Sequence, residues 1–457
     1  MLETPRPRNL PLAAARRCAQ IALIVSPLRW HEIVSQHRVP DVYTDYTDIL
    51  LNAGDIFVVA TLMFAMLWLA KSRPVKWPTP RLLPVACLAV FAVALVTSTL
   101  LSFDPVVAGQ HALRMTLLAG WAWFVCRQMS DLSWWVIPAV LLLVTESGVA
   151  MAQALLQHQV GLQHLGEALL DPGQSGISVV LHDNARWLRA YGLADHPNIL
   201  GGGISITLLM LWASIGSAAS HSGTPPNPQA STSLRGLETI GNLMRLSTLA
   251  AGSAALYLTF SRSAWLGFAV GLGTLMVTSA RFGIQSVGRF KMPLLLSGLA
   301  IGACILATSN LVLSRLDSQS TLGQSAPVLE RGFLIERTLD VAMLHPLVGV
   351  GVNNLPLMLR MLFPFFPVVY APAHLVQLTA AAEIGIPGAL AFTLLWVWPF
   401  IVALRSPGRT GRGGWALALL ACLTVISLLD YYLWTYPPGR MWLALVLGLS
   451  YSKQGTA

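Results

Sequence analysis

Long apolar runs alternate with short polar segments along almost the whole chain. Many of these runs approach the roughly 20 residues that a helix needs to cross the hydrocarbon core of a bilayer. Their length and spacing favour helices over the short alternating strands of a membrane barrel. The pattern predicts about twelve membrane-spanning helices, near residues 18–30, 49–70, 82–101, 107–126, 132–154, 197–217, 243–260, 264–280, 293–311, 384–404, 413–430 and 440–452.

Composition and charge support the same class of protein. Hydrophobic residues make up 55% of the 457 residues and charged residues only 11%, which is far from the averages of soluble domains. Basic residues gather in alternate loops, beginning with Arg6, Arg8, Arg16 and Arg17. By the positive-inside rule this distribution predicts that both termini are cytoplasmic. We therefore expect a multi-pass protein of a cytoplasmic membrane, with no nucleic-acid partner despite the net charge of +9.

Two segments between predicted spans, residues 155–196 and 312–383, are longer than ordinary connections, and the topology places both outside. In the second segment, VLERGFLIERTLDVAMLHPL predicts an amphipathic helix of about four turns that ends before Pro346. Its apolar stripe consists of Leu334, Leu339, Val341, Met343 and Leu344. We expect an all-α fold in which this helix lies against the outer face of the membrane.

Arg262 stands in LTFSRSAWLGFAV, at the joint between two predicted spans. Arginine is costly in a bilayer and is usually kept there for an anion or an internal partner, although near a span end it can also snorkel to the interface. Arg189 and Arg331 are predicted on the same outer face. A guanidinium donates a fork of hydrogen bonds, so converging arginines could clamp a diphosphate, and pairing with local carboxylates is the alternative. Arg337 is a further candidate, about 240° from Arg331 on the same helix.

Histidine on the outer face supplies a candidate base. His374 lies just ahead of an apolar span, and an imidazole with a pKa near 6.5 can accept a proton from a sugar hydroxyl. A structural role is the alternative. His196 competes for the same role but precedes a proline in DHPN, which is typical of a turn. Glu383, nine residues after His374, is a supporting candidate that could orient a partner or cap the helix.

Four stretches together resemble the O-antigen ligase and polymerase superfamily of bacterial inner-membrane proteins. They are RAYGLADHPNILGG (189–202), SRSAWLG (261–267), RGFLIERTLDVAMLHPLVGVGVNNL (331–355) and HLVQLTAAAEIGIPG (374–388). The resemblance implies a glycosyltransferase-C-like fold with a large periplasmic loop at residues 312–383. It divides the chain into N-terminal transmembrane helices (1–180), an O-antigen-ligase-like catalytic region (181–405) and C-terminal transmembrane helices (406–457).

The resemblance also implies a reaction at the periplasmic face of the inner membrane. A glycan moves from undecaprenyl diphosphate to an acceptor hydroxyl, with inversion at the anomeric carbon and with neither cofactor nor metal. By position, Arg189, Arg262 and Arg331 would hold the diphosphate of the donor. His374 would be the catalytic base that activates the acceptor.

Several functions stay open at this point. The leading hypothesis is an O-antigen ligase of lipopolysaccharide biosynthesis, whose acceptor is a sugar of lipid A-core. A polymerase would use a second lipid-linked glycan as acceptor, and a protein O-glycosyltransferase would use Ser or Thr. A lipid or solute transporter is a further alternative, for which Asp55, Arg114 and Glu146 are intramembrane candidates, but the sequence shows no convincing internal repeat.

Overall fold

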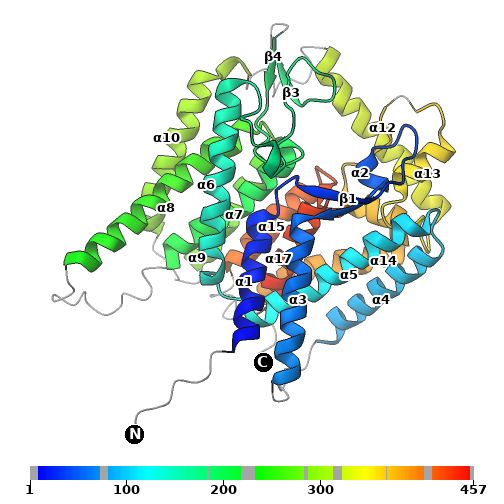
Figure 1. Ribbon diagram of the computed structural model, residues 1–457, viewed down its shortest axis with the longest axis horizontal. Coiled ribbons are helices and arrows are strands. Elements are labelled where there is room, and N and C mark those ends of the chain that lie inside the picture. The colour runs from blue at the N-terminus through cyan, green and yellow to red at the C-terminus, as the bar shows by residue number, and fades with distance from the viewer. Residues whose placement is uncertain are drawn as a thin grey trace.

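The computed structural model describes residues 9–72, 81–182, 185–217, 232–281, 287–311, 322–366, 368–405 and 414–452, and most of them are helical (Figure 1). The longer helices are α1 (Leu10–Val25), α3 (Ala53–Lys71), α4 (Leu82–Leu100), α5 (Pro105–Gln128), α6 (Ser133–Leu156), α7 (Pro197–Ser217), α8 (Thr232–Leu258), α9 (Arg262–Arg281), α10 (Lys291–Ala307), α12 (Leu322–Leu344), α14 (Val376–Arg405), α15 (Gly414–Ser427) and α17 (Pro437–Tyr451). Shorter elements are α2 (Thr44–Thr47), α13 (Leu355–Leu362), α16 (Tyr432–Thr435), η1 (Gln163–Leu165) and η2 (Val287–Phe290).

Two small antiparallel hairpins correct the prediction of an all-α fold. Strands β1 (His31–Ser35) and β2 (Ile49–Asn52) pair with each other, as do β3 (Val179–His182) and β4 (Ala185–Leu188). Each strand has only four or five residues, too few for a clear alternation of apolar and polar positions. The hairpins, α12 and α13 lie toward the same end of the molecule, while α1 begins at the opposite end (Figure 1).

Each of the twelve predicted segments overlaps a helix, although the first is shifted, because α1 ends at Val25. Among the described residues, six helices are long and apolar enough to cross a membrane: α3, α4, α6, α7 (over Pro197–Ile215), α9 and α14. Helices α10 and α15 are apolar but shorter. These helices identify the chain as a membrane protein, and the count of about twelve spans stays a prediction.

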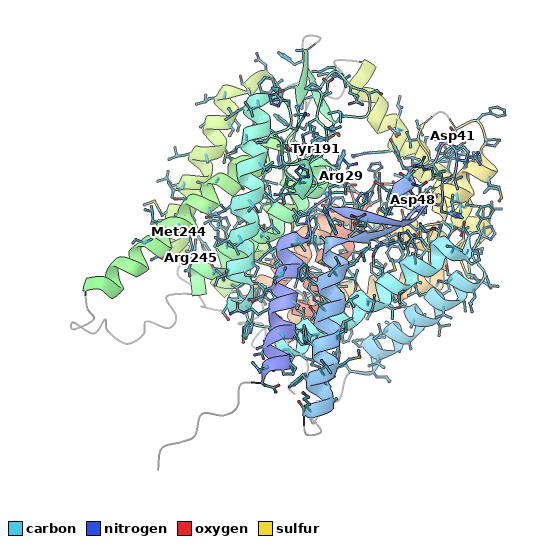
Figure 2. The ribbon with its side chains drawn as sticks, viewed as in Figure 1. Arg29, Asp41, Asp48, Tyr191, Met244 and Arg245 are labelled. Atoms are coloured by element: carbon cyan, nitrogen blue, oxygen red, sulfur yellow. The ribbon has the colours of Figure 1, made fainter. Side chains whose placement is uncertain are left out.

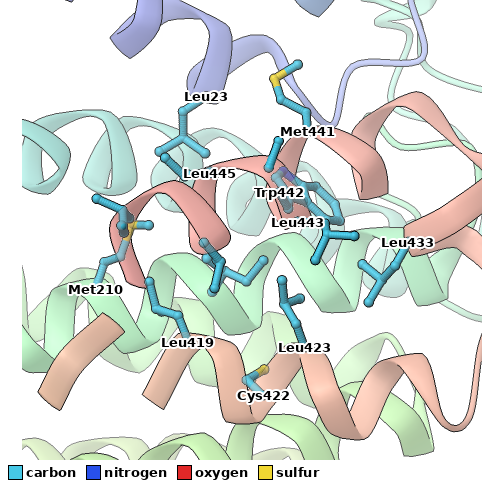
Figure 3. Packing of buried hydrophobic residues seen from close by; sticks show 14 of the residues in the cluster. Leu23, Met210, Leu419, Cys422, Leu423, Leu433, Met441, Trp442, Leu443 and Leu445 are labelled. Atoms are coloured by element: carbon cyan, nitrogen blue, oxygen red, sulfur yellow. The ribbon is translucent and has the colours of Figure 1, made fainter. Parts of the chain in front are cut away.

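Helix α7 lies at the centre of the packing, since 89% of its most apolar window is buried, against 44% or less for the other five helices. Figure 3 shows Met210 of α7 in the same cluster as Leu419 and Leu423 of α15 and Leu443 of α17. Close contact depends on small residues: a Cβ atom on Gly203 of α7 would lie 2.7 Å from the Trp442 ring. This core fixes the segments that precede α7 and α9, which carry two of the predicted arginines.

Helix α12 confirms the predicted helix before Pro346, but its apolar positions divide between two faces. Leu334 and Val341 are buried, whereas Leu339, Met343 and Leu344 are exposed. The buried face packs against α13 and α14. The sequence alone did not show that Leu339, Met343 and Leu344 face outward while Leu334 and Val341 are buried.

After α12, the backbone of residues 345–351 lies directly against the backbone of residues 382–386 in α14. We call this pair of segments the clasp. Gly385 breaks α14 with a φ of 75°, and Gly349 faces it with a φ of 74°. Three backbone hydrogen bonds join the segments: Val350 N to Ala382 O (3.0 Å), Gly351 N to Glu383 O (2.9 Å) and Ile386 N to Pro346 O (2.7 Å). The clasp therefore fixes α12 relative to the start of α14.

The three charged residues predicted within spans, Asp55, Arg114 and Glu146, are bonded to one another or to the backbone. Arg114 of α5 donates to both carboxylate oxygens of Asp55 at 3.1 and 2.8 Å and to Leu50 O at 2.6 Å. Glu146 of α6 accepts from the backbone N–H of Leu193 at 2.9 Å. Internal pairing of this kind accounts for buried charge without a transported ion.

The clasp predicts a large effect of a single methyl group. Gly349→Ala would place a Cβ 2.3 Å from the carbonyl carbon of Glu383 and would also strain the left-handed backbone. We expect it to lower the free energy of unfolding by about 2–4 kcal/mol, measured by unfolding in a fixed detergent. The control is Gly332→Ala on α12, where a Cβ meets nothing within 4 Å and helix propensity favours alanine by up to about 1 kcal/mol. Equal unfolding midpoints for the two variants would contradict the clasp.

Candidate active site

Arg262 is the first residue of α9, and the turn before it explains the serines around it. Phe260 is buried and has a φ of 47°, so the chain reverses sharply between α8 and α9. The backbone N–H of Ala264 donates to Ser261 Oγ at 3.4 Å, a long hydrogen bond at the position of a helix cap. Trp265 donates from its ring nitrogen to Leu256 O at 2.9 Å and stacks on Tyr257. These contacts present the half-buried Arg262 side chain at the start of the helix.

Arg189 follows β4 and is only 4% exposed. Its Nε donates to Thr259 O at 2.8 Å, and its Nη2 donates to Asn198 Oδ1 at 2.6 Å. The backbone N–H of Ala190 donates to Leu258 O at 3.0 Å. Arg189 therefore connects the segment before α7 to the turn that carries Arg262. Arg29, labelled with Tyr191 in Figure 2, anchors the same segment from the N-terminal region, because its backbone N–H donates to Leu193 O at 2.9 Å.

Asn198 and Asp430 belong to this network and were missed by the sequence analysis. Asn198 Nδ2 donates to Asp430 Oδ2 at 2.7 Å, and Asp430 Oδ1 accepts from the backbone N–H of Tyr431 at 2.9 Å. Asp430 is 4% exposed and lies within electrostatic range of Arg331 and Arg189. The Tyr431 ring then meets the His374 ring edge-on at 4.7 Å. A continuous set of contacts thus leads from Arg189 to His374.

Arg331 on α12 brings the predicted residues together. Its charge acts on Arg262, on His374 and on Asp430, so these groups lie within electrostatic range of one guanidinium. Within the part of the chain that the structure describes, neither Arg262 nor Arg331 forms a hydrogen bond or ion pair with a protein group. Two cations within electrostatic range of each other and without a carboxylate partner are the arrangement expected where an anion binds.

His374 lies just before α14, with its Nδ1 buried and without a hydrogen-bond partner among the described residues. Burial, reinforced by the positive charge of Arg331, lowers the pKa of His374 to about 3. The imidazole is therefore neutral at physiological pH. A neutral imidazole can accept a proton, which a protonated one cannot.

The other candidates are engaged elsewhere. Arg337 forms ion pairs with Glu336 and, at 2.7 Å, with Asp340. His196 accepts the backbone N–H of Asn198 on Nδ1 at 3.1 Å, so its proton lies on Nε2, 2.8 Å from Ser178 Oγ. The buried Glu383 of α14 accepts a hydrogen bond from the Trp434 ring at 2.7 Å. The structure therefore brings together Arg189, Arg262, Arg331 and His374. Arg337, His196 and Glu383 are each engaged in hydrogen bonds or ion pairs of their own.

Carboxylate and histidine side chains do not gather into an evident metal centre in the described part of the chain. No group of three or more His, Cys, Asp or Glu residues there has an arrangement that could hold a metal ion. The buried Asp430 carboxylate is bonded to Asn198 and to the Tyr431 backbone.

Comparison with known families agrees with the sequence motifs. Residues 247–393 match the family model described as O-antigen ligase. The matched region contains Arg262, Arg331 and His374, while Arg189 precedes it. No curated protein gives a significant match to the chain. The predicted relation to the O-antigen ligase superfamily is confirmed by this match, which supports an enzyme of the ligase or polymerase type.

The low pKa of His374 predicts a particular dependence of stability on pH. The folded protein keeps His374 neutral down to a pH of about 3, whereas an unfolded chain protonates it near pH 6.5. Protonation therefore favours the unfolded chain, and this contribution destabilises the fold increasingly as the pH falls below about 6.5. We expect the unfolding midpoint of the native protein to fall more steeply between pH 7 and pH 5 than that of His374→Gln. Parallel curves for the two proteins would show that His374 is not held neutral.

Proposed function

We propose, on the premise that residues 247–393 form an O-antigen ligase domain, that the protein transfers a glycan from undecaprenyl diphosphate to a sugar hydroxyl of lipid A-core. The reaction takes place at the periplasmic face of the bacterial inner membrane, with inversion and without a metal. The observation that carries the proposal is the pair of unpartnered arginines, Arg262 and Arg331, beside the neutral His374.

The two arginines would bind the diphosphate and stabilise it as a leaving group. Cleavage of the bond between the anomeric carbon and the phosphate oxygen leaves an electron pair and a growing negative charge on that oxygen. Preorganised donors stabilise such charge most where water is excluded. The half-buried positions of Arg262 and Arg331 satisfy this requirement better than exposed lysines on flexible stems would.

His374 would act as the base. The acceptor hydroxyl gives its proton to the imidazole while its oxygen attacks the anomeric carbon from the face opposite the diphosphate, and the new glycosidic bond forms as the old bond breaks. Because Nδ1 is engaged by no described protein group and the ring is neutral, the imidazole can take this proton. Tyr431 packs against the ring and limits its orientation.

Arg189 contributes in a different way from the other two arginines. Two of its nitrogens are engaged by Thr259 and Asn198, and the side chain is almost fully buried. We assign it the role of holding the Arg262 turn and Asp430 in place around the diphosphate. It therefore supports donor binding mainly through the position of its neighbours.

A polymerase is the second candidate, and the family match favours it as much as a ligase. The donor site described above would be the same in both, and only the acceptor would differ. A transporter receives less support, since Asp55 and Arg114 satisfy each other and Glu146 is bonded to the backbone.

Substitution of the unpaired arginines should separate catalysis from folding. We expect Arg262→Gln and Arg331→Gln each to lower kcat by about 100-fold or more, since each removes a donor to the leaving group. Arg337→Gln is the matched control on α12: its guanidinium is already paired with Asp340, and we expect activity within about threefold of the native enzyme. Full activity of a correctly folded Arg262 or Arg331 variant would contradict the proposed clamp.

The acceptor decides between ligase and polymerase. Purified protein in lipid nanodiscs receives labelled undecaprenyl diphosphate-linked glycan and lipid A-core in the presence of a metal chelator. We expect the label to move to lipid A-core. A ladder of longer glycans on the polyprenyl carrier would instead identify a polymerase, and transfer that returns only with added magnesium would overturn the arginine mechanism.

A further inference from the structure

A long apolar groove lies away from the candidate active site, between α4, α5, α14 and α17. Figure 1 shows α4 and α5 next to each other, and contacts join α4 to α14 and α5 to α17. Two of the four helices, α4 and α14, are candidate membrane spans. The groove encloses about 370 Å³ and is lined largely by aliphatic and aromatic side chains.

The groove is elongated along α5 and α17. Its lining runs from Met115 to Arg127 on α5 and from Arg440 to Tyr451 on α17. These runs of thirteen and twelve helical residues extend over about 17 Å, so the groove is long and narrow. A volume of about 370 Å³ is at the lower end of the range of ligand sites, about 300–1,000 Å³. These dimensions suit one extended hydrocarbon chain better than a compact solute.

Aromatic rings pack together at the end of the groove nearer the candidate active site. Phe392 stacks with Phe91 at 5.9 Å and meets the Trp434 ring at 5.1 Å. Trp434 in turn donates to the buried Glu383. Arg440, which also lines this end, is 4% exposed and bonded to His111 Nδ1 at 2.7 Å. Packed aromatic rings and hydrogen-bonded polar side chains therefore line this end of the groove.

The opposite end is rich in positive charge. Arg127 lines the groove there, together with Tyr451 and the first turn of α4, which Arg81 precedes. Arg16 of α1 reaches the end of α5, where it donates to Gln128 at 3.4 Å. Lys71 is the last residue of α3 and is exposed. Asp131 is an acidic residue in the same region, so the charge at this end is mixed but predominantly positive.

We propose that this groove binds one acyl chain of an anionic phospholipid, with the phosphate of its headgroup near Arg127. The apolar lining and length match the chain, and the cationic end matches the phosphate. On the predicted topology the headgroup lies in the cytoplasmic leaflet, on the side opposite the candidate active site. The site is independent of the proposed glycan transfer.

Native mass spectrometry of the whole protein tests this proposal. The delipidated protein in mild detergent receives equal amounts of phosphatidylglycerol and phosphatidylcholine with the same chains. We expect one retained phosphatidylglycerol, favoured at least fivefold over phosphatidylcholine. Ala119→Trp, which fills the groove, should lower retention at least fivefold, whereas Leu113→Trp should leave it unchanged, because Leu113 is 60% exposed on the same helix but does not line the groove.

Arg127→Gln keeps the groove open and supplies a second, independent variant. It should lower the ratio of retained phosphatidylglycerol to phosphatidylcholine toward one. The total lipid retained should stay within twofold of that of the native protein. Three results would overturn the proposal: equal retention of both lipids by the native protein, equal losses in the Ala119 and Leu113 variants, or displacement of phosphatidylglycerol by undecaprenyl diphosphate. The last result would assign the groove to the donor instead.

Discussion

The placement of two arginines within electrostatic range of each other, neither of them paired with a carboxylate, is the constraint on which the structure of the site depends. Arg262 and Arg331 repel each other, and partly buried positions weaken the screening that water would provide. The fold must therefore hold them in place by other contacts. The turn at Phe260 and Ser261 fixes one arginine, and the clasp between α12 and α14 fixes the helix that carries the other.

The same electrostatics connects donor binding to the proposed base. Burial and the charge of Arg331 keep His374 unprotonated. A diphosphate bound between the arginines would offset that charge and would make the imidazole a better proton acceptor when the donor is present. Asp430, held by Asn198 within reach of Arg189 and Arg331, lies nearby without pairing directly with the half-buried guanidinium groups of Arg262 and Arg331. In the proposed mechanism, donor binding and base strength would thus be coupled through one cationic centre.

The sequence predicted the helices well because span length and apolar content are local properties, and it identified Arg262 because an arginine between two apolar segments is unusual. Asn198 and Asp430 could not be found in this way. They lie 232 positions apart in the sequence, and a single acidic residue in SLLDYYLW carries no pattern. Helix geometry predicted that Arg331 and Arg337 point in different directions. Only the ion pairs with Glu336 and Asp340 show that Arg337 is the one engaged by carboxylates. The short hairpins and the division of the apolar positions of α12 between two faces depend on tertiary packing. The periodicity of apolar residues along the sequence does not predict that packing.

The most direct test of the central claim is the binding of undecaprenyl diphosphate to the protein in nanodiscs, in the presence of a metal chelator and without an acceptor. The account predicts saturable binding of undecaprenyl diphosphate. It predicts that undecaprenyl monophosphate binds with at least tenfold lower affinity. It also predicts that the double variant Arg262→Gln, Arg331→Gln loses about 100-fold or more in affinity, as expected for two charge-assisted contacts of about 1.5–3 kcal/mol each. Binding that survives in the double variant, or that appears only with added magnesium, would contradict it.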